Sequence, residues 1–111
     1  MTSNISKPPP EPFYQDELDV LKEIKRILWR HLDRKMYKAF VYGSRATGDY
    51  FKWSDIDVGV EGKREIPSTT YFDIEEELEE SDIPYVLELV DFCKVKPDFK
   101  KRAMEKIIPL N

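Results

Sequence analysis

Two acidic residues separated by one position, Asp55 and Asp57, are the first candidates for chemistry. They alternate with Ile56, Val58 and Val60, which is the pattern of a β-strand. Side chains two positions apart on a strand emerge on the same face, so the two carboxylates should lie together and repel each other. A divalent cation relieves such repulsion, and Mg²⁺ combines one or two carboxylates with substrate phosphates. Taken alone, an Asp-x-Asp pair is more simply a solvated strand face in a chain with this much charge.

A third carboxylate, Glu88, stands inside the apolar run from Val86 to Phe92, which predicts another strand. A charge among Leu and Val residues is costly to bury unless a partner compensates it. If this strand lies beside the first acidic one, Glu88 completes a group of three acidic side chains with Asp55 and Asp57. Asp91 falls on the opposite face, nearer the strand end, where a surface residue or a cap is expected. It stays open as the rival third carboxylate.

A Gly-Ser pair precedes the acidic motif. Gly43 and Ser44 follow a predicted strand over 38–42 and are expected to begin a short helix. Backbone N–H groups at such a point can bind a phosphate, and the Ser hydroxyl can donate to a phosphate oxygen. Gly43 would let the phosphate approach closely, Gly48 would close the turn, and Arg45 would add positive charge. By itself the pair is equally an ordinary turn.

The composite is more specific than its parts: Gly43-Ser44, ten residues, then Asp55-Ile56-Asp57. In this composite the chain resembles the minimal nucleotidyltransferases of the DNA polymerase β-like superfamily, over about residues 18 to 108. The resemblance implies an enzyme that binds a nucleoside triphosphate, here ATP, with two Mg²⁺ ions, which Mn²⁺ could replace. Such an enzyme passes the nucleoside monophosphate to an acceptor hydroxyl and releases pyrophosphate.

The resemblance also implies roles for single residues. It assigns nucleotide binding to Gly43, Ser44 and Arg45. It assigns metal binding and catalysis to Asp55, Asp57 and Glu88, with acceptance of the hydroxyl proton as a further role of Glu88. Relatives more often have Asp at this last position, so the longer Glu is a departure.

A domain of this size resembles the antitoxin halves of HEPN–minimal nucleotidyltransferase pairs, whose partner is an all-helical HEPN ribonuclease toxin. In that setting AMP from ATP is attached to a Tyr of the toxin. The resemblance therefore implies a protein adenylyltransferase that acts as an antitoxin within a hetero-oligomer. Two alternatives remain open at this point. One is a binding protein with a degenerate site that neutralises its partner by contact alone, and the other is a transferase that acts on a small-molecule acceptor.

The rest of the sequence must position these residues. Residues 1–14 contain four prolines, at positions 8, 9, 10 and 12, and predict a flexible arm, which leaves 15–111 as the minimal nucleotidyltransferase domain. Hydrophobic periodicity predicts helices over 16–34, from 70 or 71 to 80, and over 97–108, and strands over 38–42, 55–60 and 85–92. These elements predict an α/β (α+β) fold, a small mixed sheet flanked by helices, as in the nucleotidyltransferases it resembles.

Composition excludes several classes of protein. The 111 residues include 18 Lys and Arg against 22 Asp and Glu, and a net charge of −4 argues against a general nucleic-acid binder. The longest apolar run, residues 39–42, is far too short to span a membrane, and the N-terminus has no stretch resembling a signal peptide, so we expect a cytoplasmic protein. The single Cys93 excludes an intrachain disulfide.

Two charged stretches have simple explanations. The acidic run over 75–80 is expected to be a solvated helix face, with contact to a basic partner as a further option. The basic residues of the last predicted helix are expected in solvent, with recognition of a phosphate or of an acidic partner as the less favoured interpretation. These basic residues are Lys100, Lys101, Arg102 and Lys106.

Overall fold

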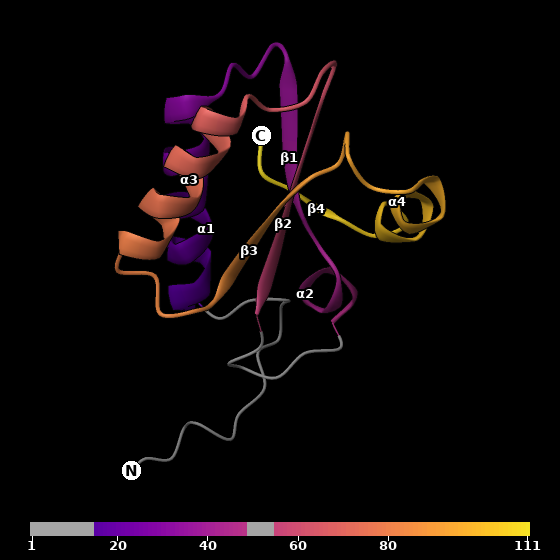
Figure 1. Cartoon of the computed structure of the whole chain (residues 1–111). Helices are drawn as coiled ribbons and strands as arrows, with labels where there is room; N and C mark the ends of the chain where they lie inside the picture. Colours follow the sequence, from indigo (N-terminus) through magenta and orange to yellow (C-terminus); the bar gives the residue numbers. More distant parts are fainter. Residues whose placement is uncertain (1–14, 49–54) are drawn as a thin grey trace.

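The computed structural model describes residues 15–48 and 55–111 (Figure 1). The predicted arm over residues 1–14 lies outside the described residues and stays a prediction. The elements are, in chain order, α1 (Gln15–His31), β1 (Tyr37–Tyr42), α2 (Ser44–Thr47), β2 (Ile56–Gly62), α3 (Ser68–Glu80), β3 (Leu87–Asp91), α4 (Pro97–Ala103) and β4 (Ile108–Pro109). None of the described helices is long and apolar enough to cross a membrane.

The four strands form one mixed sheet in the order β3-β2-β1-β4. β1 pairs antiparallel with both β2 and β4, whereas β2 and β3 run parallel. The parallel register sets Asp57 opposite Glu88, and the antiparallel register sets Tyr42 opposite Asp57. Because β1 ends at Tyr42 and α2 begins at Ser44, these three residues meet at one end of the sheet. Figure 1 shows α2 beside that end. The predicted mixed sheet flanked by helices is confirmed.

One face of the sheet is covered by α1 and α3, which lie side by side (Figure 1). Ile56, Val58 and Val60 point to this face and are completely buried, as the alternation along β2 predicts. They belong to the main core together with apolar residues of both helices, among them Ile24, Ile27, Leu28, Ile74 and Leu78. Burying each such side chain stabilises the fold by about 1.5–3 kcal/mol. This face is closed, so the acidic residues that alternate with it must emerge on the other face.

The opposite face carries an aromatic cluster of Phe40, Tyr42 and Phe92, against which α4 packs. The rings meet edge to face, with centroids 5.0 Å apart for Phe40 and Phe92 and 5.1 Å apart for Tyr42 and Phe92. Gly59 lies beneath them, and a Cβ at this position would be 2.4 Å from Cε1 of Phe40 and 2.6 Å from Cε1 of Phe92. Glycine therefore lets the cluster lie directly on the sheet and determines where α4 sits.

The last predicted helix is too long. The sequence predicts a helix over 97–108, but α4 ends at Ala103, and Ile108–Pro109 forms β4 on the edge of β1. The short apolar segment near the C-terminus fits the period of a helix as well as that of a strand, and it forms a strand because it can pair with the free edge of β1. Leu110 is completely buried there. Its N–H donates a hydrogen bond to the Ala39 carbonyl at 2.9 Å, and its own carbonyl accepts one from Nε1 of Trp29 at 3.0 Å.

The other predicted elements exist with shifted ends. The first helix ends at His31 rather than at residue 34, α3 begins at Ser68, β2 extends to Gly62, and β3 is shorter than predicted at both ends. Ends of this kind shift easily because terminal turns are held by few hydrogen bonds. The central residues of every element, which carry the site, are where the sequence predicts them.

Candidate active site

Asp57 and Glu88 form the centre of the site, because neighbouring parallel strands hold them side by side in register. Their carboxyl groups share a hydrogen bond. Burial, followed by the negative charges of Glu88 and Asp55, raises the pKa of Asp57 to about 6. Asp55 is exposed immediately before β2 and acts on Asp57 through its charge. The structure thus places Asp57 and Glu88 side by side, with Asp55 near enough to act on Asp57 through its charge.

The acidic residues offer oxygen donors of the kind that Mg²⁺ takes. In the described ranges, no group of three His, Cys, Asp or Glu side chains is already arranged to hold a metal ion. Asp57 and Glu88 converge closely enough to share a proton, and a cation between them would replace that proton and remove their repulsion. The donor set therefore fits a divalent cation that takes its remaining ligands from a substrate and from water.

Gly43 closes the site from the side of β1. It has φ 77° and ψ −152°, a conformation that favours glycine, and it begins the single turn of α2. A Cβ on Gly43 would lie 2.6 Å from Oδ2 of Asp57, so only glycine lets this turn come so near the carboxylate. The predicted short helix after Ser44 is confirmed, and Gly48 ends it in the left-handed conformation with φ 89°. The first N–H groups of such a turn have no partner within it and face outward.

A groove of about 630 Å³ runs from these residues toward α4. Asp57 and Gly43 line one wall, and Phe99, Arg102 and Lys106 line the other. The sequence interpretation left Arg102 and Lys106 in solvent and did not assign them to the site. The spacing of residues 99, 102 and 103 signals one shared face of α4, whereas Lys106 lies in the turn that follows this helix. Glu105 also lines the groove, so the groove leads from Asp57 to a side on which two cationic side chains stand beside one carboxylate.

Tyr42 forms the floor between the two ends. Its ring meets Phe99 edge to face with centroids 5.9 Å apart. Burial, followed by the negative charges of Asp57 and Glu88, raises the pKa of Tyr42 to about 12. The hydroxyl therefore stays protonated, and Tyr42 offers the groove an aromatic surface rather than a further negative charge.

Arg45 takes a different position from the one expected. Its side chain is completely buried, and its guanidinium lies over the ring of Tyr85 with 4.9 Å between Cζ and the ring centroid. Tyr85 precedes β3, so this contact ties α2 to the approach of the strand that carries Glu88. The geometry makes Arg45 a support of the site's walls, and a nucleotide contact by its side chain stays a prediction that the packing does not favour.

Asp91 is not a surface residue, and this part of the prediction is wrong. Its side chain is buried, and it accepts hydrogen bonds from the N–H groups of Ile66 at 2.8 Å and Cys93 at 2.9 Å. It thereby caps the turn after β3, as the alternative expectation had it, and holds the segment that precedes α3. Asp91 points to the face opposite Glu88, which leaves Glu88 as the carboxylate beside Asp57.

Comparisons with known proteins agree with this geometry. Residues 22–110 match the family model described as "Polymerase beta, Nucleotidyltransferase". The chain is 26% identical over 87 residues to a probable protein adenylyltransferase, MntA, of Haemophilus influenzae, which covers 77% of this chain and 76% of that protein. Its fold is similar to that in a crystal structure of a toxin–antitoxin with AMP-PNP, with a TM-score of 0.67, 19% identity, and coverage of 82% of this chain and 72% of the other.

A second solved structure shares the fold. It is the complex of a tri-AMPylated Shewanella oneidensis HEPN toxin with an MNT antitoxin, with a TM-score of 0.56 and 16% identity. The match covers 82% of this chain and 71% of the other.

Proposed function

Because the chain belongs to the polymerase β nucleotidyltransferase family, we propose that it transfers AMP from ATP to a tyrosine hydroxyl of a HEPN-type partner and thereby acts as its antitoxin. The observation that carries the proposal is the groove in which Gly43, Asp57 and two cationic side chains face one another. The similarity to MntA and to antitoxins in complexes with HEPN toxins supports the choice of acceptor. A protein with this role would act in the cytoplasm, where ATP and the partner are present.

The groove suits the triphosphate of ATP. Gly43 allows a phosphate to approach the backbone, and the Ser44 hydroxyl and the outward N–H groups of α2 can donate to its oxygens. Arg102 and Lys106, on the opposite wall, supply positive charge for the remaining phosphate oxygens. The aromatic floor at Tyr42 and the Phe99 ring offer an apolar surface to the nucleoside.

The acidic end suits the reacting groups. Asp55, Asp57 and Glu88 would hold two Mg²⁺ ions, which when bound would lower the pKa of the attacking hydroxyl and stabilise the leaving pyrophosphate. The hydroxyl oxygen forms a bond to the α-phosphorus while the bond from this phosphorus to the bridging oxygen of the pyrophosphate breaks. The hydroxyl proton would pass to Glu88, the residue to which the resemblance assigns this role and which lies beside Asp57 on the neighbouring strand.

The test uses ATP labelled on the α-phosphate, Mg²⁺, and the product of the neighbouring gene, which this proposal expects to be a HEPN-type protein. Label is expected on the partner with the wild-type chain, and it should be lost with Asp55→Asn/Asp57→Asn. Asp98→Asn serves as the control, because Asp98 is exposed in the first turn of α4 and does not line the groove. If the double variant neutralises the partner fully and no label appears with the wild type, the chain acts by contact alone. If label appears only on a small-molecule acceptor, the proposed acceptor is wrong.

A further inference from the structure

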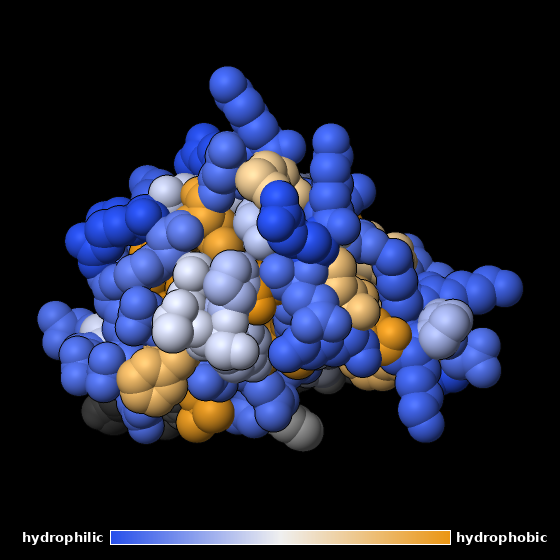
Figure 2. Space-filling view, turned by 45° about the horizontal axis from the view of Figure 1, so that its top comes forward, coloured by the Kyte–Doolittle hydropathy of each residue, from blue (hydrophilic) through white to orange (hydrophobic). Residues whose placement is uncertain are grey.

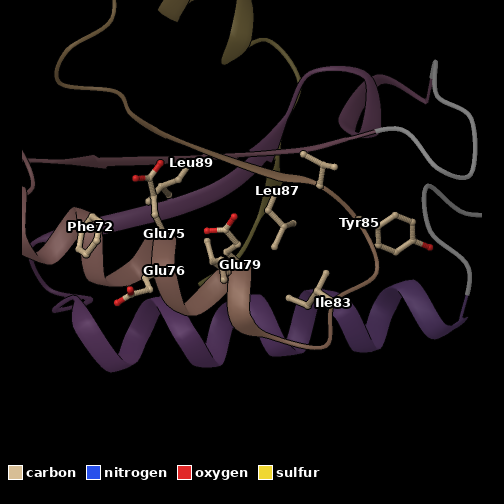
Figure 3. A pocket seen from close by; sticks show the side chains of 10 residues that line it. Phe72, Glu75, Glu76, Glu79, Ile83, Tyr85, Leu87 and Leu89 are labelled. Carbon is tan, nitrogen blue, oxygen red and sulfur yellow. The ribbon is translucent and has the colours of Figure 1, made fainter.

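A second groove, of about 490 Å³, lies between α3 and β3 (Figure 3). Its apolar surface comes from Leu78 of α3 and from Ile83, Leu87 and Leu89 on the β3 side. Both walls are fixed relative to each other, because the Tyr71 hydroxyl of α3 donates a hydrogen bond to the Leu89 carbonyl of β3 at 2.5 Å. The groove is therefore part of the folded surface and does not depend on a rearrangement of the two elements.

Large apolar side chains remain exposed at this groove. Phe72 of α3 is 59% exposed and Val86, just before β3, is 65% exposed. These are the two highest exposures among the large exposed hydrophobic residues of the described part of the chain. Much of the rest of the surface is hydrophilic, as the face in Figure 2 shows. An apolar patch with polar margins on such a surface is typical of an interaction site.

The margin of the groove carries three negative charges with no ion-pair partner among the described residues. Glu75, Glu76 and Glu79 stand along α3 at its edge (Figure 3). On the other side of the same helix, Glu77 pairs with Arg30 and His31 of α1. Among the ion pairs of the described residues, none involves the three groove glutamates. The negative charge of α3 is thus neutralised toward α1 and left open toward the groove.

We propose that this groove binds a basic segment of a partner protein, with an apolar side chain seated between α3 and β3 and Lys or Arg side chains facing the glutamates. The charge selects cations over anions, and the exposed apolar residues supply the contact area that a charged rim alone lacks. The basic and apolar character of the segment is inferred from the side chains that line the groove. Its identification with a HEPN-type protein rests on the function proposed above.

The groove and the candidate active site share strand β3. β3 is an edge strand of the sheet. Its residues alternate, so Leu87 and Leu89 line the groove on one face while Glu88 faces Asp57 on the other. A partner held in the groove and extending around this open edge would reach the acidic end of the site. Docking at α3 and β3 would therefore raise the local concentration of an acceptor hydroxyl there.

The experiment compares two charge reversals on one helix. Glu75→Lys/Glu79→Lys changes the groove, whereas Asp73→Lys/Glu80→Lys makes the same change in net charge at exposed residues of α3 outside it. Phe72→Ala tests the apolar contact, and Leu18→Ala, at an exposed apolar residue of α1, is its control. Binding is measured by calorimetry at low and at physiological salt, with thermal melting to confirm that each variant folds.

Two probes separate this proposal from the proposed function. The first is the product of the neighbouring gene, which the proposed function expects to be a HEPN-type protein. The second is a synthetic twelve-residue peptide of Lys and Leu, with a Lys and Ser peptide as its control. For the Lys and Leu peptide, and for the HEPN-type protein if it binds, the dissociation constant should rise at least about tenfold in the groove variants and less than about twofold in the controls. Transfer of AMP to the partner should show a higher KM for the partner and an unchanged kcat.

Two outcomes would overturn the groove proposal, and two others would overturn only the proposed function or its catalytic part. Equal weakening by both charge reversals would mean that the peptide responds only to net charge. A wild-type chain that sediments as a dimer, and as a monomer only in the groove variants, would mean that a second copy occupies the groove. If the HEPN-type protein does not bind at all, the proposed function fails, and the peptide measurements alone decide about the groove. If it binds through the groove and never receives label, only the catalytic proposal fails.

Discussion

A Cβ atom on Gly43 would lie 2.6 Å from Oδ2 of Asp57. The turn at the start of α2 and the central carboxylate of the site therefore cannot both keep their places if residue 43 has a side chain. The same glycine has a φ of 77°, which L-residues rarely adopt. The contact joins the two motifs that lie on either side of the ten-residue spacer.

Gly43→Ala should therefore lower AMP transfer at least about a hundredfold, because the methyl group displaces either the turn or the Asp57 carboxylate. Gly48→Ala is the matched control. Gly48 also has a positive φ, of 89°, but a Cβ there meets no atom within 4 Å. Both variants should lose about 1 kcal/mol of stability or more from backbone strain, and only Gly43→Ala should lose transfer in a labelled-ATP assay. Equal loss of transfer in both would contradict this role of Gly43.

The raised pKa of Asp57 makes a prediction for the metal-free protein. The carboxyl has a pKa of about 6 in the fold, above its ordinary value of 3.8, so the fold favours its protonated form. This contribution is fully present below about pH 3.8 and is lost as the pH rises through about 6. Asp57→Asn removes the penalty, so with EDTA it should be more stable than the wild type by about 1 kcal/mol at neutral pH, a value that allows for solvent screening of a half-exposed group.

Urea unfolding between about pH 4 and pH 8 provides the measurement for Asp57→Asn. The difference from the wild type should shrink toward zero at the acidic end, where the wild-type carboxyl is already neutral. Asp98→Asn, at an exposed position, should show no such trend. A stabilisation by Asp57→Asn that does not change with pH would show that the effect is not electrostatic.

The positive wall of the groove should matter for ATP binding. Arg102→Gln/Lys106→Gln removes both charges that face Asp57 across the groove, and the KM for ATP should rise about tenfold or more, as expected for the loss of charge-assisted hydrogen bonds to phosphate. Lys101→Gln changes an exposed neighbour on α4 that does not line the groove and should leave KM within about twofold. Steady-state kinetics with ATP as the varied substrate distinguish the two. An equal change in both variants would place the ATP phosphates elsewhere.

We expect Asp91 to have a structural role and Glu88 a catalytic one. Asp91→Ala leaves two N–H groups without their acceptor in a buried place and should lower the free energy of unfolding by about 2–4 kcal/mol. Glu88→Gln, at an exposed position, should change stability little and lower transfer at least about a hundredfold. Chemical denaturation and labelled-ATP transfer, measured on both variants, test the pair. Full activity in Glu88→Gln would make Glu88 dispensable and contradict the assignment.

The local patterns of the chain were sufficient for most of the fold. The two-residue period along β2 placed Ile56, Val58 and Val60 in the core and put Asp57 on the other face, and the apolar stripe of α1 followed from its helical spacing. Such periods are properties of the backbone itself and need no knowledge of distant residues. The end of the last helix could not be predicted in this way, because a short apolar segment fits a helix or a strand until a free edge such as that of β1 is available.

What the sequence by itself determined is the Gly-Ser turn, the Asp-x-Asp strand and the alternation that could bring Glu88 to the same face, since each depends on spacing within one segment. Only the tertiary structure decided that β3 lies parallel to β2 in the register that pairs Glu88 with Asp57. Folding also buried Arg45 against Tyr85 and brought Arg102 to the groove. These contacts join segments far apart in the chain, and packing of whole faces and pairing of strand edges select among the arrangements that local geometry permits.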